Sequence, residues 1–188
     1  MAKKLITLFD LPIAAPSANL SERTSVTNIM DIDPILVKKI FVLKDKQSSH
    51  GLESTVVRID NNNEIEVLRY GSITVEELNK YAKVKIKKKS SISPGNLKKH
   101  YSTLKPIRMN AKRILKNEGL LNFGNNKLKS KIINLNLSNK KNLNEAAKNF
   151  YHYLHKLDQS RCKKIAVVEI PDKGLGKTIN DRLRRAIK

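Results

Sequence analysis

Lys131-Ile-Ile-Asn-Leu-Asn-Leu137 and Lys164-Ile-Ala-Val-Val-Glu-Ile170 are two strand-like stretches that flank one long helical pattern. In that pattern, residues 143–157, apolar side chains recur at the spacing of a single helix face over four turns. A second helical pattern follows over residues 176–187. Strands that alternate with helices in this way predict a small parallel α/β domain.

Two helix starts carry capping residues. Asn142 and Glu145 stand at the start of the long helical pattern. Thr74 and Glu77 form a Thr-x-x-Glu capping box, in which each side chain accepts a hydrogen bond from a backbone N–H near the other residue. We expect the helix that begins after Thr74 to run to about Ala82.

The first part of the chain mixes short helical and strand signals. Residues 55–59 and 65–68 are β-rich runs, and the three asparagines between them are a hairpin signal. Residues 1–10 read as the end of a helix, and residues 33–41 carry the apolar stripe of another. The Pro12–Pro16 stretch reads as a short buried strand because small apolar residues alternate there.

A segment without periodicity separates these two patterns. Residues 85–106 are basic at first and continue with Ser-Ser-Ile-Ser-Pro-Gly, which is typical of a linker. The sequence therefore predicts a first domain over residues 1–84, a linker over residues 85–106 and a second domain over residues 107–188.

Composition excludes several classes of protein. No apolar run approaches the ~20 residues that a membrane helix needs. The single cysteine, Cys162, cannot form an internal disulfide and is typical of a reducing compartment, so we expect a cytoplasmic protein that does not bind membranes. His152 and His155 can share a helix face, but no third ligand accompanies them, and we predict no metal site.

The positive charge is unevenly distributed. Residues 1–60 hold 8 basic and 7 acidic side chains, whereas residues 61–188 hold 30 basic and 10 acidic ones, a net charge of +20. Such an excess attracts polyanions, and tRNA is a candidate partner. The alternative is codon bias, because Lys, Asn and Ile are all abundant and the lysines are scattered without interleaved aromatic side chains.

Three short phrases are richer in small polar residues than a core segment would be. They are Pro12-Ile-Ala-Ala-Pro-Ser-Ala-Asn-Leu-Ser21, His50-Gly-Leu-Glu-Ser-Thr-Val-Val57 and Ser93-Pro-Gly-Asn-Leu-Lys-Lys-His-Tyr101. Hydroxyl, amide and backbone N–H groups of this kind can donate to a phosphate without adding bulk. Each phrase alone also fits a capped turn, a polar strand entry or a generic linker.

Taken in this order, the phrases resemble the threonylcarbamoyl-AMP synthases of the YrdC-like class, in the long form with an extra C-terminal domain. The resemblance implies an α/β fold: the C-terminal half of a YrdC-like twisted sheet domain, a linker that acts as a lid, and a small Rossmann-like domain. It also implies a nucleotidyltransferase that joins L-threonine, bicarbonate and ATP into threonylcarbamoyl-AMP and pyrophosphate. As partners, the resemblance implies tRNA or the tRNA threonylcarbamoyl transferase, which uses the product to modify tRNA.

The resemblance also assigns roles to residues. It implies threonine binding by Ala15, through its backbone, and by Ser54, with Thr55 as a rival for the second role. It implies ATP binding, with Mg²⁺ accompanying the nucleotide, and no single catalytic side chain. The implied ATP-binding residues are Ser17, Asn19, Ser25, Arg69 and Tyr101. An arginine at the Arg69 position can hold phosphate oxygens bidentately.

The sequence departs from the family pattern at several points. Arg58 stands where Asp is usual, Tyr70 replaces a Pro, and Asn96 replaces a Met. The family's Pro-Thr-Glu-Thr-x-Tyr-Gly-Leu strand and its Lys-x-Arg phosphate-binding pair do not occur in the sequence. The resemblance therefore implies a truncated and impaired enzyme. Two alternatives stay open: a basic RNA-binding or accessory module without chemistry, and half of a split enzyme that needs a partner chain.

A further stretch, Lys173-Gly-Leu-Gly-Lys-Thr178, follows a strand and precedes a helix, as a P-loop does. A P-loop requires Gly where Pro171 stands, and proline has no N–H to offer a phosphate. We therefore interpret this segment as an ordinary helix start.

Overall fold

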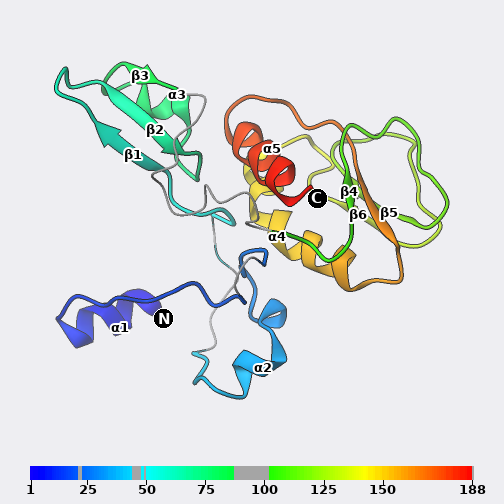
Figure 1. The fold of residues 1–188 in the computed structure, drawn as a ribbon, viewed down its shortest axis with the longest axis horizontal. Helices are drawn as coiled ribbons and strands as arrows, with labels where there is room; N and C mark the ends of the chain where they lie inside the picture. The colour runs from blue at the N-terminus through cyan, green and yellow to red at the C-terminus, as the bar shows by residue number, and fades with distance from the viewer. Residues whose placement is uncertain (21–22, 44–47, 49, 87–101, 188) are drawn as a thin grey trace.

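The computed structural model describes residues 1–20, 23–43, 48, 50–86 and 102–187 (Figure 1). Its main body is a four-stranded sheet with the strand order β4-β7-β5-β6, in which every pairing is parallel. Its strands are β4 (Ile107–Arg108), β5 (Glu118–Asn122), β6 (Asn134–Asn136) and β7 (Lys164–Val167). This sheet confirms the predicted parallel α/β fold.

Two helices cover this sheet. They are α4 (Leu143–Gln159) and α5 (Leu175–Ala186), which pack against each other. Figure 1 shows both on the side of the sheet that faces the N-terminal half of the chain. Asn142 caps α4 as predicted, because its side chain accepts hydrogen bonds from two backbone N–H groups of the first turn. Glu145 does not complete a capping box, since its carboxylate accepts from the Ser138 hydroxyl.

The core of this body is made by one face of α4, the sheet and one face of α5. The side chains of Phe150, Leu120 and Leu183, one from each of these layers, are fully buried. Burial on this scale is what stabilises amphipathic helices, whose intrinsic propensity alone is marginal. The apolar spacing seen in residues 143–157 is therefore the packing face of α4.

A second, smaller sheet precedes the first along the chain. Strands β1 (Val56–Ile59) and β2 (Ile65–Arg69) form the predicted antiparallel hairpin, and β3 (Val84–Lys85) pairs with β2 in parallel. Helix α3 (Val75–Leu78) begins with the predicted capping box, in which the hydrogen bonds run in both directions. It ends at Leu78 rather than near Ala82, and turns continue the chain to β3.

The first 40 residues contribute three short helices. Helix α1 (Ala2–Phe9) confirms the predicted helix at the start, but it has no buried residue. A 3₁₀ turn, η1 (Ile29–Asp31), and α2 (Pro34–Val37) follow. Helix α2 is shorter than the predicted 33–41 stretch. Its apolar residue Ile35 is 59% exposed, so no packing face extends the helix.

One strand prediction was wrong, and one buried strand was not predicted. Residues 12–16 are exposed and form no strand, because prolines at both ends remove N–H donors and no described segment pairs with them. Conversely, β5 was missed. Its five residues, Glu-Gly-Leu-Leu-Asn, are all buried, so they show none of the alternation of apolar and polar residues that marks a half-exposed strand.

Within the described residues, no helix has both the length and the apolar character needed to cross a membrane. Most of the predicted linker, including its Ser93–Tyr101 phrase, lies outside the residues that the structure describes.

Candidate functional site

Glu53 lies where three parts of the chain meet. Its carboxylate accepts hydrogen bonds from the hydroxyl of Ser25, the hydroxyl of Tyr151 (2.6 Å) and Nε of Arg182 (3.1 Å). Tyr151 belongs to α4 and Arg182 to α5. Glu53 therefore connects the second phrase of the N-terminal half to both helices of the larger sheet.

Arg182 is the buried cation of this junction. Its side chain is only 1% exposed. Besides Glu53, its guanidinium donates to the carboxylate of Asp181 and to the backbone carbonyl of Tyr70, each at 2.6 Å. A buried charge is tolerated only when it is paired and hydrogen-bonded, and these contacts meet that condition. The Arg182 side chain thus fixes the end of β2 as well as Glu53.

The carboxylate of Glu53 is held in its charged form. Burial by itself raises the pKa of Glu53, but the positive charge of Arg182 and the hydrogen bonds from Ser25 and Tyr151 lower it further than burial raises it. The net effect is a pKa below the ordinary value for Glu. Glu53 therefore acts as a hydrogen-bond acceptor rather than as a proton donor.

Arg69 and Ser54 touch at the edge of this junction. Nη2 of Arg69 lies 3.0 Å from the carbonyl oxygen of Ser54 and 3.2 Å from its hydroxyl. The hairpin register explains the contact. Arg69 ends β2 opposite Val56, and Val56 follows Ser54 by two residues. The side chain predicted to hold phosphate and the one predicted to hold an amino acid are therefore neighbours.

Two glycines allow the surrounding backbone to pack this closely. Gly51 has φ +66°, and a Cβ there would lie 2.2 Å from the carbonyl oxygen of Ala147 in α4. A Cβ on Gly71 would lie 2.3 Å from the backbone of Ser54. Any larger residue at either position would push the Glu53–Ser54 segment away from its neighbours.

The other predicted site residues lie in different surroundings. Ala15 and Ser17 are exposed, and the Ser17 side chain makes no hydrogen bond within the described residues. Asn19 is half-buried. Tyr101 lies outside the described residues. The structure thus brings together Ser54 and Arg69 and joins Ser25 to Glu53, the residue before Ser54, but it does not place Ala15 or Ser17 in contact with them.

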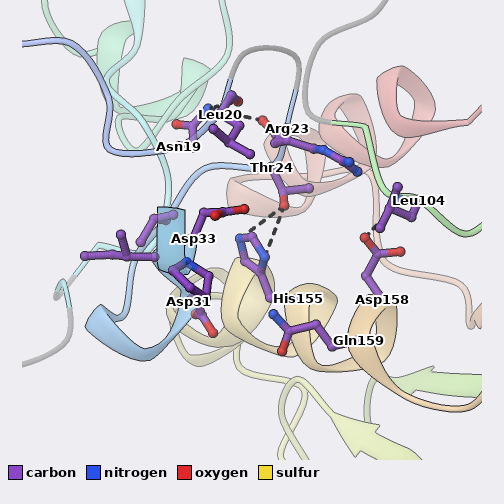
Figure 2. A pocket seen from close by; sticks show the side chains of 13 residues that line it. Asn19, Leu20, Arg23, Thr24, Asp31, Asp33, Leu104, His155, Asp158 and Gln159 are labelled. Carbon is purple, nitrogen blue, oxygen red and sulfur yellow. Dashed lines mark hydrogen bonds between the residues drawn. The ribbon is translucent and has the colours of Figure 1, made fainter. Parts of the chain in front are cut away.

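Asn19 lines a cavity of about 160 Å³ between the N-terminal segment and α4 (Figure 2). Figure 2 shows Thr24 and His155 pointing toward each other across it, with Thr24 Oγ1 3.1 Å from His155 Nε2. The amide nitrogen of Asn19 donates to the Leu20 carbonyl, but its Oδ1 is buried without a partner in the described residues. A ligand that donates a hydrogen bond would satisfy this oxygen.

The charged groups that line this cavity differ in whether they have hydrogen-bond partners. Asp31 lies 2.8 Å from Nδ1 of His152, Asp33 caps α2, and Asp158 accepts from two backbone N–H groups. The side chain of Arg23, by contrast, has no partner within the described residues. The carboxylates are therefore structural, whereas among the described residues the Arg23 guanidinium is the charged group that could pair with an anionic ligand.

The Lys173–Thr178 segment is a structural helix start, in agreement with the rejection of a P-loop. The hydroxyl of Thr178 is buried and donates to the carbonyl of Gly71 at 2.9 Å. Nζ of Lys177 lies 3.8 Å from the Glu76 carboxylate. These side chains tie α5 to the smaller sheet instead of lining a phosphate site.

Sequence reasoning did not identify the residues that hold the junction together. Glu53 lies in the His50–Val57 phrase, where the hydroxyls of Ser54 and Thr55 give the stronger signal for ligand binding. Arg182 and Tyr151 lie in helical patterns, and periodicity marks Tyr151 as a core residue. A positive charge on the buried face of α5 was the one available signal, because an arginine there requires a buried anion.

As a whole, the junction offers hydroxyls and one half-buried guanidinium at Arg69, and the cavity beside α4 offers a second cation at Arg23. Such groups suit a small polar ligand that carries negative charge. Among the described residues, no three His, Cys, Asp or Glu side chains are grouped so that they could hold a metal ion.

Comparison with known proteins gives two family matches that together span most of the chain. Residues 73–187 match the family model described as the C-terminal domain of threonylcarbamoyl-AMP synthase. Residues 1–71 match a model described as telomere recombination, named for Sua5, YciO and YrdC.

Similar individual proteins agree. The chain is 26% identical over 214 positions to a threonylcarbamoyl-AMP synthase of Pyrococcus abyssi, covering 99% of this chain and 61% of that protein. The crystal structure of P. abyssi Sua5 complexed with L-threonine superposes with a TM-score of 0.82 at 25% identity, covering 98% of this chain and 60% of that one. A variant of the same protein gives a TM-score of 0.74 at 24% identity, with 98% and 58% covered. The chain therefore spans about three-fifths of the length of these relatives.

Proposed function

Because the chain belongs to the threonylcarbamoyl-AMP synthase family, we propose that it takes part in making threonylcarbamoyl-AMP and pyrophosphate from L-threonine, bicarbonate and ATP. The observation that carries this proposal is the contact between Arg69 and Ser54, since these are the cation that we propose for phosphate and the hydroxyl that we propose for the amino acid. The activated carbamate would pass to a tRNA threonylcarbamoyl transferase and then to tRNA. We also propose a cytoplasmic location, where ATP and tRNA are found together.

In this proposal Arg69 neutralises the phosphates of ATP, while Ser54 and the backbone of Ala15 hold L-threonine. The structure of P. abyssi Sua5 with L-threonine supports an amino-acid site in this family. The threonine amine attacks bicarbonate with loss of water, and an oxygen of the resulting carbamate attacks the α-phosphorus while pyrophosphate leaves. Positioning and charge neutralisation are the main contributions that the protein makes to such a reaction.

Ser17, Asn19 and Ser25 are the further ATP contacts we propose, with Tyr101 reaching the nucleotide from the linker. The hydroxyl of Ser25 already donates to Glu53. It can donate to a phosphate only by leaving that carboxylate, so nucleotide binding and the Glu53 contact would compete. Mg²⁺ would arrive bound to the ATP phosphates, where it would neutralise charge on the leaving pyrophosphate.

Calorimetric titration of the chain with ATP and with L-threonine tests the site. Arg69→Ala should weaken ATP binding by about 1.5–3 kcal/mol, the scale of a hydrogen bond to a charged group. Ser54→Ala should weaken threonine binding alone. Arg161→Ala is the matched control, because Arg161 is exposed and remote in sequence from the site. Equal ATP affinities for the Arg69 and Arg161 variants would contradict the proposed site.

Turnover is a separate question, because the sequence has no Lys-x-Arg pair for the phosphates. We expect the chain alone to release pyrophosphate far more slowly than the ~1 per second of an ordinary enzyme. A polypeptide equivalent to the unmatched part of the relatives should restore the rate. It would cover the exposed apolar side chains of α1 and the edge of β1 that pairs with no strand among the described residues. A normal rate from the chain alone would refute this requirement.

A second candidate function is RNA binding without chemistry. The excess of 30 basic over 10 acidic side chains in residues 61–188 favours it. The two candidates make different predictions, because RNA binding weakens steeply with salt and does not depend on L-threonine.

A further inference from the structure

The larger sheet has a cavity of its own, of about 450 Å³, that shares no lining residue with the site around Glu53. Asn122 and Asn136, the last residues of β5 and β6, line it together with the loops that leave those strands. In Figure 1 these strands lie in the body to the right of α4. Ligands of open parallel α/β sheets bind at this carboxyl edge, because the loops there diverge and leave a crevice.

Asn122 presents an unused hydrogen-bond donor to this cavity. The residue is only 8% exposed. Its Oδ1 accepts hydrogen bonds from the Phe123 N–H, at 2.9 Å, and from the amide of Asn126. Its Nδ2 donates to no acceptor among the described residues, although an amide nitrogen can make two such bonds. An acceptor on a bound ligand would satisfy it.

The walls beside this donor are apolar. Leu120, Leu128 and Leu135 line the cavity, and Asn136 is held in place because its amide donates to the Gly124 carbonyl at 2.9 Å. A flat ring with hydrogen-bond acceptors on one edge, such as a nucleobase, combines the apolar faces and the polar edge that these walls require.

One lysine, Lys129, lines the cavity, and four more belong to the stretch of chain that supplies most of its lining. Residues 123–144 contain five lysines and no acidic residue. All five lysines are exposed and unpaired with any carboxylate among the described residues: Lys127, Lys129, Lys131, Lys140 and Lys141. Uncompensated lysines next to a crevice attract phosphate groups, and the attraction is screened by salt.

We propose that this cavity binds a nucleoside phosphate, with the base between the leucines, its acceptor on Nδ2 of Asn122, and the phosphate at Lys129. The nucleotide is either free or part of a single-stranded RNA. This site is distinct from the proposed ATP site, so each can fail without the other.

Asn122→Asp tests the donor with little change of shape. The aspartate keeps an acceptor for the Phe123 N–H and for Asn126, but it replaces the free NH₂ with a negative oxygen. We expect AMP, measured by calorimetry, to bind at least 10-fold more weakly to this variant. Arg161→Ala, at an exposed position outside both proposed sites, should leave AMP binding unchanged. A loss in Arg69→Ala with none in Asn122→Asp would place AMP at the other site and overturn the proposal.

A fluorescent 12-nucleotide oligoadenylate RNA, measured by anisotropy, distinguishes the two sources of the ligand. Tighter binding of the oligonucleotide than of AMP, with a loss of affinity in Lys129→Glu, identifies RNA; equal or weaker binding identifies the free nucleotide. Lys116→Glu is the matched control, since this exposed lysine precedes the amino end of β5. The site would be refuted if Lys129→Glu and Lys116→Glu lost equal affinity for both AMP and the RNA while Asn122→Asp bound them like wild type. That result would show diffuse charge attraction.

Discussion

Residues 107–187 and residues 1–86 are stabilised in different ways. Every buried member of the main hydrophobic core except Leu52 comes from the first of these regions. In the second region, α1 has no buried residue and α2 none either. The smaller sheet buries a few side chains, among them Ile65 and Val67, which is less than an independent core requires.

Polar contacts join the second region to the first. Besides the contacts of Glu53, the Asp31 carboxylate pairs with His152 on α4, and the Gly71 carbonyl accepts from Thr178 on α5. The segments that carry the candidate site therefore take their positions from α4 and α5. Hydrogen bonds and ion pairs fix position well but contribute little net stability, so the site region depends on its neighbour.

The largest expected effect is on folding in isolation. We propose that residues 107–188 form a domain that folds alone, because its sheet, helices and core are complete. Residues 1–84 alone should not give a cooperative unfolding transition. Circular dichroism during urea titration of the two fragments measures this. A cooperative transition for residues 1–84 would remove the contrast between the two regions.

Arg182→Leu should have the next largest effect, a loss of about 3–5 kcal/mol, because it leaves Glu53 and Asp181 without the buried cation they share. Urea denaturation of the full chain measures this loss. Arg184→Leu is the control: Arg184 is also on α5, but its side chain is 57% exposed, and the change should stay within ~0.5 kcal/mol. Similar values for both variants would mean that the junction is energetically unimportant.

Core truncation compares the two regions directly. Leu157→Ala in α4 should cost about 2–5 kcal/mol, because the side chain is fully buried and leaves a cavity. Ile6→Ala in α1 should change the free energy of unfolding by less than ~0.5 kcal/mol, because Ile6 is 56% exposed. Denaturant midpoints of the two variants measure both changes in the free energy of unfolding. A large loss at Ile6 would show that α1 is covered by some surface in solution.

Acid should release the junction before it unfolds the larger sheet. The pKa of Glu53 is lower in the folded chain than in the unfolded one, so its contribution is complete above its ordinary pKa of about 4.5. That contribution is lost as pH falls through the lowered value. Hydrogen exchange at decreasing pH should show earlier loss of protection in β1 and β2 than in β7. In Glu53→Gln, the difference in protection between β1 and β2 on one side and β7 on the other should no longer depend on pH below about 4.5.

The smallest expected effect concerns two helix caps of the same kind. Asn142→Ala should lower stability by about 1 kcal/mol, because α4 is part of the core and its fraying is coupled to global unfolding. Asp33→Ala removes the equivalent side-chain cap from α2, and it should leave the melting temperature unchanged, since the four-residue helix buries nothing. A shift of equal size in both variants would show that α2 belongs to the same cooperative unit.

The local patterns that were predicted correctly are those with strong signals in neighbouring residues. The hairpin of residues 56–69, the capping box at Thr74 and the long helix after Asn142 all follow from spacing and capping chemistry. Strand β5 was not predicted because a strand buried on both faces shows no alternation. The strand prediction for the Pro12–Pro16 stretch was wrong because alternation alone does not supply a partner strand.

For the candidate site, the sequence by itself determined which residue types are present and in which phrases they lie. Only the tertiary structure decided that Arg69 touches Ser54, that Ser25 donates to Glu53, and that the buried Arg182 pairs with Glu53. The reason is physical: the pairing of a buried charge depends on which segments, 129 residues apart for Glu53 and Arg182, pack together. No short-range sequence pattern encodes a pairing between residues so far apart in the sequence. Hydrogen bonds within one turn or one hairpin, by contrast, are fixed by residues a few positions apart.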